Sequence, residues 1–122
     1  MSRTKEISSL PPITEREFQG MIIDYARLKG WRCAHFRPAR LLDKDGKERW
    51  RTPVEADGAG WFDLVLVRPP FLYFVECKRD GESLSPKQQI WYDLLLACRS
   101  SAYIRVFVWH PSEWAEIEER LE

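Results

Sequence analysis

The chain has 122 residues, which fits one domain with a single core and leaves no room for a second. Its composition, with 44% hydrophobic and 31% charged residues and no apolar run near the ~20 residues of a membrane span, excludes a disordered chain and a membrane protein. The 19 basic and 19 acidic residues cancel, so net charge by itself does not indicate a nucleic-acid partner.

The N-terminal segment MSRTKEISSLPP has no apolar stretch of the kind that a signal peptide requires. We therefore expect a cytoplasmic protein without a membrane partner. Residues 1–12 are predicted to be a mobile tail, and residues 13–122 a single folded domain.

A helix is predicted from Thr14 to about Lys29, ended by Gly30. Thr14 is a good helix-capping residue, and the segment repeats apolar residues at helical spacing. These residues are Phe18, Met21, Ile22, Tyr25, Ala26 and Leu28.

Two glutamates in the first turn of this helix have different predicted positions. At about 100° per residue, Glu15 falls inside the apolar stripe, which we expect to face a sheet, whereas Glu17 falls at its margin. Glu17 matches a capping box with Thr14, and Gln19 would reach the neighbourhood of Glu15. We favour a role for Glu15 in a functional site. The alternative is that its charge only complements the helix dipole.

The segment after a short predicted strand at 31–36 is basic and rich in turn residues. Residues 27–51 hold nine basic and three acidic side chains, and residues 37–60 are predicted to form a long surface loop or a frayed hairpin around Asp45-Gly46. A basic patch beside aromatic residues is what binding of a phosphate backbone needs. An ordinary solvated charge mixture is the alternative.

The remaining elements complete an α-β-β-β-α-β-α order. Strands are predicted at 61–67, 72–78 and 103–109, a helix from Ser85-Pro86 to about Cys98, and a last helix capped by Ser112. The order indicates an α/β (α+β) fold, with a small mixed sheet flanked by helices.

An acid lies in each of the two central strands. If Arg68 to Phe71 form a four-residue hairpin loop, Asp63 lies directly opposite Glu76, with Cβ atoms about 5 Å apart. Two carboxylates at that distance repel by roughly 3 kcal/mol at an effective dielectric of about 20. Lys78, two residues after Glu76 on the same face, does not neutralise both.

A divalent cation explains the pair better than a salt bridge does. Mg²⁺ takes oxygen ligands, typically one or two carboxylates with waters and substrate phosphate. Two acids and a lysine on one strand pair therefore indicate a site that cleaves phosphodiester bonds. A half-buried ion pair, or a register shifted by one residue, remains the alternative.

The three cysteines, Cys33, Cys77 and Cys98, are odd in number and have no CxxC spacing. They are predicted to be reduced and structural. A scattered zinc site made of Cys33, His35 and His110 stays open as an alternative, although no spacing favours it.

The ordered set of motifs resembles the VRR-NUC family of the PD-(D/E)xK nuclease superfamily, whose fold is restriction-endonuclease-like. The resemblance is carried by TEREFQ, GW, HFRPAR, DGAGWFDLVLV, FVECKR, LSPKQQIW and VFVWHPSE, over about 95 residues. Phe62 stands where the family usually has a proline before the aspartate, a departure that removes no ligand.

The resemblance implies a metal-dependent DNA endonuclease using Mg²⁺ or Mn²⁺. Its catalytic residues would be Glu15, Asp63, Glu76, Lys78 and Gln88, and its metal ligands would be Glu15, Asp63, Glu76 and the backbone carbonyl of Cys77. For Gln88, a capping box with Ser85 is an equally good explanation.

The resemblance further implies a branched DNA substrate, such as a four-way junction or a flap, and a homodimer. Flanking phosphates would be bound by His35, Arg37, Arg40, Lys44, Lys47, Arg49 and Arg51. An isolated histidine on a strand is more often a packed core residue, and this is the alternative for His35. Three alternatives remain: a nuclease on ordinary duplex or single-stranded DNA, a non-catalytic DNA-binding module, and a structural domain with an ion-pair network.

Overall fold

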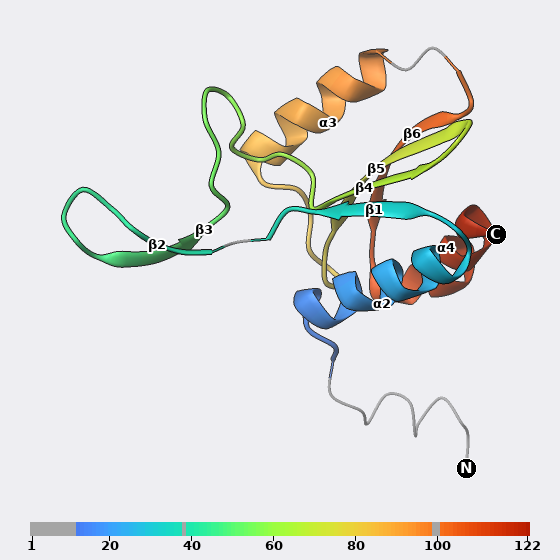
Figure 1. Cartoon of the computed structure of the whole chain (residues 1–122), viewed down its shortest axis with the longest axis horizontal. Coiled ribbons are helices and arrows are strands. Elements are labelled where there is room, and N and C mark those ends of the chain that lie inside the picture. Colours follow the sequence, from blue (N-terminus) through green and yellow to red (C-terminus); the bar gives the residue numbers. More distant parts are fainter. Residues whose placement is uncertain (1–11, 38, 99–100) are drawn as a thin grey trace.

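The computed structural model describes residues 12–37, 39–98 and 101–122. Its centre is a small four-stranded mixed sheet, which confirms the predicted fold class, and the strands lie in the order β1-β4-β5-β6 (Figure 1). The strands are β1 (Arg32–His35), β4 (Leu64–Arg68), β5 (Phe71–Cys77) and β6 (Ile104–Trp109). The β5–β6 pair is parallel, and the two other pairs are antiparallel.

Three helices flank this sheet. Helices α2 (Glu15–Leu28) and α4 (Trp114–Leu121) lie together on one face, and α3 (Pro86–Cys98) lies on the other (Figure 1). Thr14 caps α2 through the predicted capping box, in which the Glu17 backbone N–H donates to Thr14 and the Thr14 backbone N–H donates to Glu17. None of these helices in the described part of the chain is long and apolar enough to cross a bilayer.

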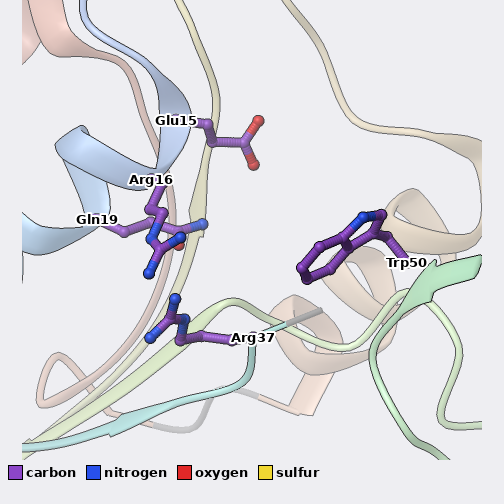
Figure 2. A pocket seen from close by; sticks show the side chains of 5 residues that line it. All are labelled: Glu15, Arg16, Gln19, Arg37 and Trp50. Carbon is purple, nitrogen blue, oxygen red and sulfur yellow. The ribbon is translucent and has the colours of Figure 1, made fainter. Parts of the chain in front are cut away.

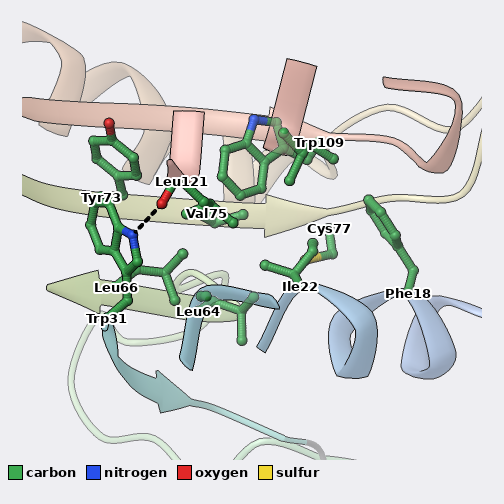
Figure 3. Close-up of a cluster of buried hydrophobic side chains, with 12 residues drawn as sticks. Phe18, Ile22, Trp31, Leu64, Leu66, Tyr73, Val75, Cys77, Trp109 and Leu121 are labelled. Carbon is green, nitrogen blue, oxygen red and sulfur yellow. Dashed lines mark hydrogen bonds between the residues drawn. The ribbon is translucent and has the colours of Figure 1, made fainter. Parts of the chain in front are cut away.

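The hydrophobic core fills the space between the sheet and the α2–α4 pair (Figure 3). Alternate side chains of β4 and β5 point into it, because successive residues of a strand face opposite sides. The indole N–H of Trp31 donates to the Leu121 carbonyl at 2.9 Å, which ties α4 to the start of β1. Residues of the core with no exposed surface include Phe18, Ile22, Ala26, Leu64, Leu66, Val75, Cys77, Ile117 and Leu121.

The register of the β4–β5 hairpin is the one predicted. Val67 pairs with Leu72 and Val65 with Phe74, which places Asp63, just before β4, opposite Glu76. The loop itself is shorter than predicted, because Arg68 and Phe71 also pair and leave only Pro69-Pro70 as the turn. The pairing of the strands is the same as predicted, because the observed turn is shorter than the predicted loop by one residue on each side.

The segment between β1 and β4 forms the hairpin that the sequence left as one of two options. Strands β2 (Ala39–Leu42) and β3 (Glu48–Arg51) pair antiparallel as a separate two-stranded sheet. This arm projects away from the central sheet (Figure 1). Its turn is held by Asp43, whose carboxylate accepts hydrogen bonds from the backbone N–H groups of Asp45 and Lys47.

The prediction that Ser112 caps the last helix is wrong. A 3₁₀ turn, η1 (Pro111–Glu113), precedes α4, and Ser112 lies within it. The backbone N–H of Ser112 donates to Asp80, while Glu113 accepts from the backbone N–H of His110. Ser112 does not act as the cap because Pro111 starts the 3₁₀ turn one residue earlier.

Gly60, three residues before Asp63, is pressed against the first turn of α3. Its backbone has a positive φ of 87°, and a Cβ atom added there would lie 2.6 Å from the Lys87 carbonyl carbon. Only glycine fits both demands. The contact fixes the approach to Asp63 against the start of α3.

We expect Gly60→Ala to lower the free energy of unfolding by roughly 2–5 kcal/mol, from left-handed strain plus a backbone clash. The matched control is Gly81→Ala, because Gly81 has a similar φ of 85° but nothing within 4 Å of the added Cβ. That control should lose only the strain, about 1–2 kcal/mol. Urea unfolding measures both, and equal losses would contradict the proposed contact.

Candidate active site

Asp63 and Glu76 are joined by two hydrogen bonds that cross from one strand to the other. The backbone N–H of Asp63 donates to Glu76 Oε1 at 3.0 Å, and the backbone N–H of Cys77 donates to Asp63 Oδ2 at 2.8 Å. The Asp63 carbonyl also accepts from the backbone N–H of Phe36 at 2.9 Å. Each carboxylate thus accepts a hydrogen bond from the main chain of the neighbouring strand, and both lie at one end of the two central strands.

The second oxygen of Glu76 has no hydrogen-bond partner. Glu76 has no exposed surface, and its Oε2 is the buried side-chain oxygen without a partner in the described residues. An unpaired carboxylate oxygen in the interior is costly, and native structures rarely keep one without a reason. The arrangement calls for a proton or a cation at Oε2.

Burial and the neighbouring Asp63 charge raise the pKa of Glu76 to about 8. Burial also raises the pKa of Asp63, although the Cys77 N–H and the Lys78 ammonium act in the opposite direction. The pair therefore keeps a proton near neutral pH when no cation is present. Glu76 is the member of the pair that we expect to hold it.

Glu15 and Lys78 complete the charged cluster. Burial and then the Asp63 charge raise the pKa of Glu15, while the Lys78 ammonium lowers the pKa of Glu15, Asp63 and Glu76 alike. Glu15 is half-buried on the first turn of α2, as its place in the apolar stripe predicted, whereas Glu17 is exposed. Asp63 and Lys78 therefore lie within electrostatic reach of both Glu15 and Glu76.

The backbone carbonyl of Cys77 lies at the same end of the strands as the two acids. The N–H of Lys78 donates to the Trp109 carbonyl on β6, so the N–H and C=O of Cys77 both point the other way, toward Asp63. The thiol of Cys77 is buried on the core side. The carbonyl of Cys77, rather than its sulfur, is therefore on the side of the two acids.

A cleft of about 750 Å³ opens beside the acids. It brings together Glu15 from α2, Asp63 from the sheet and Gln88 from α3, and its far wall is the 52–61 segment. Gln88 also forms the predicted capping box, because the Ser85 backbone N–H donates to its Oε1 at 2.9 Å. Gln88 therefore caps α3 and lines the cleft at once.

A second hollow, of about 410 Å³, lies beside the first and shares Glu15 with it (Figure 2). We call it the arginine hollow; it is lined by Glu15, Arg16, Gln19, Arg37 and Trp50. Gln19 is held by His35, whose ring Nε2–H donates to Gln19 Oε1 at 2.8 Å. Burial, then Arg37 and Arg16, lower the pKa of His35, so it is neutral at pH 7.

Among the other basic residues predicted to bind phosphates, Lys44, Lys47 and Arg49 do not line the cleft or the arginine hollow. Lys44 and Lys47 lie near the tip of the β2–β3 arm, and the Arg49 guanidinium is paired with Asp43 at 2.6 Å. The side chains of Arg40 and Arg51 lie outside what the structure describes. Of this predicted set, Arg37 is the arginine that lines the arginine hollow.

The zinc alternative is wrong. Cys33 and His35 lie on β1, and His110 follows β6, at the opposite edge of the sheet. Both ring nitrogens of His110 are engaged, one by Glu113 and one by the Glu82 carbonyl. The described residues contain no cluster of three or more His, Cys, Asp or Glu side chains with metal-binding spacing. A magnesium site does not need one, because one or two carboxylates with waters and phosphate suffice.

The sequence analysis missed Arg16 and Trp50. Arg16 looked like an ordinary exposed residue of an amphipathic helix, and Trp50 like part of a loop. A weak signal existed for Arg16, since it neighbours Glu15 in the first turn of the helix. No local pattern places Trp50 beside that turn, because the contact depends on how the β2–β3 arm leaves the sheet.

The raised pKa of Glu76 has a measurable consequence for stability in EDTA. A carboxyl with a pKa of about 8 in the folded state and an ordinary value near 4.5 in the unfolded state binds more protons when folded between those values. The free energy of unfolding therefore falls as pH rises from about 5 to 8. Glu76→Gln has no such titration, so we expect the melting temperature of wild type minus that of this variant to decrease across this range.

Glu17→Gln is the control of opposite sign. Hydrogen bonds from the Thr14 backbone and side chain lower the pKa of Glu17, so its contribution to stability is lost only as pH falls through the acidic range. A difference for Glu76→Gln that stays constant from pH 5 to 8 would contradict the raised pKa.

Comparison with known proteins agrees with this geometry. Residues 28–110, more than half of the chain, match the VRR-NUC domain family, a nuclease family of the restriction-endonuclease-like superfamily. The match contains the acid pair, the lysine and Gln88, while Glu15 lies before it. No curated protein and no solved structure matches the chain. The chain belongs to the VRR-NUC domain family and is a DNA-acting nuclease of that kind.

Proposed function

We propose that the chain is an Mg²⁺- or Mn²⁺-dependent endonuclease that cuts branched DNA. The observation that carries the metal dependence is Glu76 Oε2, a buried carboxylate oxygen without a hydrogen-bond partner beside a second carboxylate. A proton satisfies it at the cost of a raised pKa, and a divalent cation would satisfy it together with Asp63.

The donor set fits a hard cation. Asp63 and Glu76 offer carboxylate oxygens, the Cys77 carbonyl lies at the same end of the strands, and Glu15 adds a third carboxylate within electrostatic reach of Asp63. Oxygen donors of this kind suit Mg²⁺ or Mn²⁺ better than zinc, which prefers imidazole and thiolate ligands.

The bound ion would lower the pKa of a coordinated water and neutralise charge on the scissile phosphate. Lys78 would orient the attacking water and place a proton donor close to the same phosphate, because the charge of its ammonium acts on all three acids. Arg37 would bind a flanking phosphate from the neighbouring hollow. Gln88 lines the opposite wall, where its amide would help to position the DNA strand.

The test uses purified protein with a labelled four-way junction and a linear duplex of matched sequence. We expect cleavage of the junction to be faster than that of the duplex, to require Mg²⁺ or Mn²⁺, and to stop in EDTA. Asp63→Ala should lower the rate by roughly 10²–10³-fold or more, because it removes a ligand of the charge-stabilising group. Asp24→Ala, an exposed acid on α2, is the matched control and should cut normally.

Metal binding is followed separately by melting temperature. Mg²⁺ or Mn²⁺ should raise it in wild type and not in Asp63→Ala, because a ligand that binds only the folded state stabilises it. DNA binding without cutting under every metal tried would instead make the chain a non-catalytic module. A large destabilisation by Asp63→Ala with no metal effect in wild type would leave only an ion-pair network.

A homodimer is part of the proposal, because a four-way junction offers two symmetric strands while one chain carries one acid pair. Helix α3 supports a second copy as the partner. It buries none of its residues fully, and it exposes Ile90 by 60% and Leu94 by 55% on one side, one helical turn apart.

We expect light scattering to find a dimer that Leu94→Glu converts to a monomer by placing a charge in the apolar contact. Leu42→Glu is the matched control, because Leu42 is 66% exposed on the β2–β3 arm. A wild-type monomer at micromolar concentration, or a dimer that only the control disrupts, would contradict α3 as the interface.

A further inference from the structure

A third hollow, of about 720 Å³, lies where α2 and β1 run beside each other toward the turn at Gly30 (Figure 1). We call it the distal hollow; its walls include Ile23 and Arg27 of α2 and Arg32 and Cys33 of β1. Arg27 and Arg32 are exposed, and within the described part of the chain no acidic residue lines the hollow or pairs with either guanidinium. The hollow therefore offers two positive charges to an anionic ligand.

The distal hollow adjoins the arginine hollow. His35 lines the distal hollow and Gln19 lines the arginine hollow, so the hydrogen bond of 2.8 Å between these two side chains joins the two surfaces. Glu15 then joins the arginine hollow to the cleft that contains Asp63. The three concave surfaces thus follow one another from the acid pair to the turn at Gly30.

Helix α2 sets the length of this path. At about 100° per residue, Arg16, Ile23 and Arg27 fall within about 40° of one another, so one stripe of the helix follows the path from the arginine hollow to the distal hollow. From Arg16 to Arg27 the helix rises about 17 Å at 1.5 Å per residue. Phosphates of one duplex strand follow each other at about 3.4 Å along the axis, so Arg27 lies about five base pairs beyond Arg16.

The distal hollow offers charge without an aromatic face. Trp31, which also lines it, is only 4% exposed and lies in the core (Figure 3). The His35 ring is partly buried and is bonded to Gln19. Sites for single strands combine positive charge with aromatic rings on which unpaired bases stack, whereas a paired arm can be bound through its backbone alone. The described lining of the distal hollow therefore fits the backbone of a duplex.

We propose that the distal hollow binds the phosphate backbone of a duplex arm that extends from the cleavage site. Arg27 and Arg32 bind phosphates of this arm about five base pairs beyond those at the arginine hollow. Guanidinium groups suit this role, because their paired N–H donors match phosphate oxygens. The inference rests on the proposed nuclease function and adds that the substrate needs a paired arm long enough to reach the turn at Gly30.

Binding of a labelled four-way junction to the full chain is measured by fluorescence anisotropy in EDTA, at a series of salt concentrations. Arg27→Gln and Arg32→Gln should each weaken binding several-fold and make the slope of log K against log salt shallower by about 1, because each removes one phosphate contact. Arg27→Lys and Arg32→Lys keep the charge and should keep most of the slope. Arg105→Gln, on β6 at the opposite edge of the sheet, is the matched control and should bind as wild type does.

Arm length separates the distal hollow from the rest of the site. Junction arms of about 4 base pairs, closed by hairpin loops, end before Arg27, whereas arms of about 12 base pairs pass it. The variant with both Arg27→Gln and Arg32→Gln should lose affinity for the long-armed junction only, and making the long arms single-stranded should abolish this difference from wild type. Equal losses on short and long arms, or losses no larger than those of Arg105→Gln, would overturn the proposal. Melting temperatures establish that each variant is folded, and the single variants serve if the double variant is not.

The two levels of the proposal fail in different ways. Binding that depends on Arg27, Arg32 and arm length, with no cleavage of any DNA under any metal, would support the distal hollow and overturn the nuclease. Metal-dependent cleavage, with the salt slope and the arm-length dependence unchanged in the double variant, would overturn the distal hollow and leave the nuclease standing.

Discussion

The exchange of hydrogen bonds between the start of β4 and the end of β5 is the constraint on which the site depends. Asp63 gives its backbone N–H to Glu76, and the residue after Glu76 gives its own to Asp63. Main-chain groups of a hairpin have little freedom, so both carboxylates are held without relying on flexible side-chain partners. The crowding of negative charge is thus a property of the fold itself.

The two faces of the sheet divide the work between stability and chemistry. Leu64, Leu66 and Val75 point toward α2 and α4 and form part of the core. The alternate positions of the same strand pair, whose side chains point to the other face, are occupied by the two acids and the lysine. Helices α2 and α3 lie on opposite faces of the sheet and contribute Glu15 and Gln88 to one cleft at the end of the central strands. The apolar core therefore fixes the backbone, and the backbone holds the two carboxylates close together in spite of their mutual repulsion.

Much of this could be predicted from the sequence, because it depends on local periodicity. A Pro-Pro turn between two apolar runs fixes which residues of the two strands pair with each other. This register places Asp63 opposite Glu76. Helical periodicity likewise separated Glu15 from Glu17. The roles of these residues in metal binding and catalysis remain predictions, since geometry and family membership alone do not test them.

The parts that escaped prediction depend on tertiary placement or on competition between local signals. Trp50 and Arg16 come from elements far apart in the chain, and only the path of the β2–β3 arm brings them together. Ser112 resembles a helix cap, but a proline beside it begins a 3₁₀ turn first. The unpartnered oxygen of Glu76 is set by a side-chain torsion, for which no sequence pattern exists.

The β2–β3 arm has a consequence for how such a protein changes over time. Strand β1 pairs directly with β4, so the arm is an insertion that contributes nothing to the ladder of the central sheet. Its length and sequence can vary without moving Asp63 or Glu76. Related chains can therefore acquire new substrate preferences by exchanging one peripheral module, while the inherited hydrolytic centre stays intact.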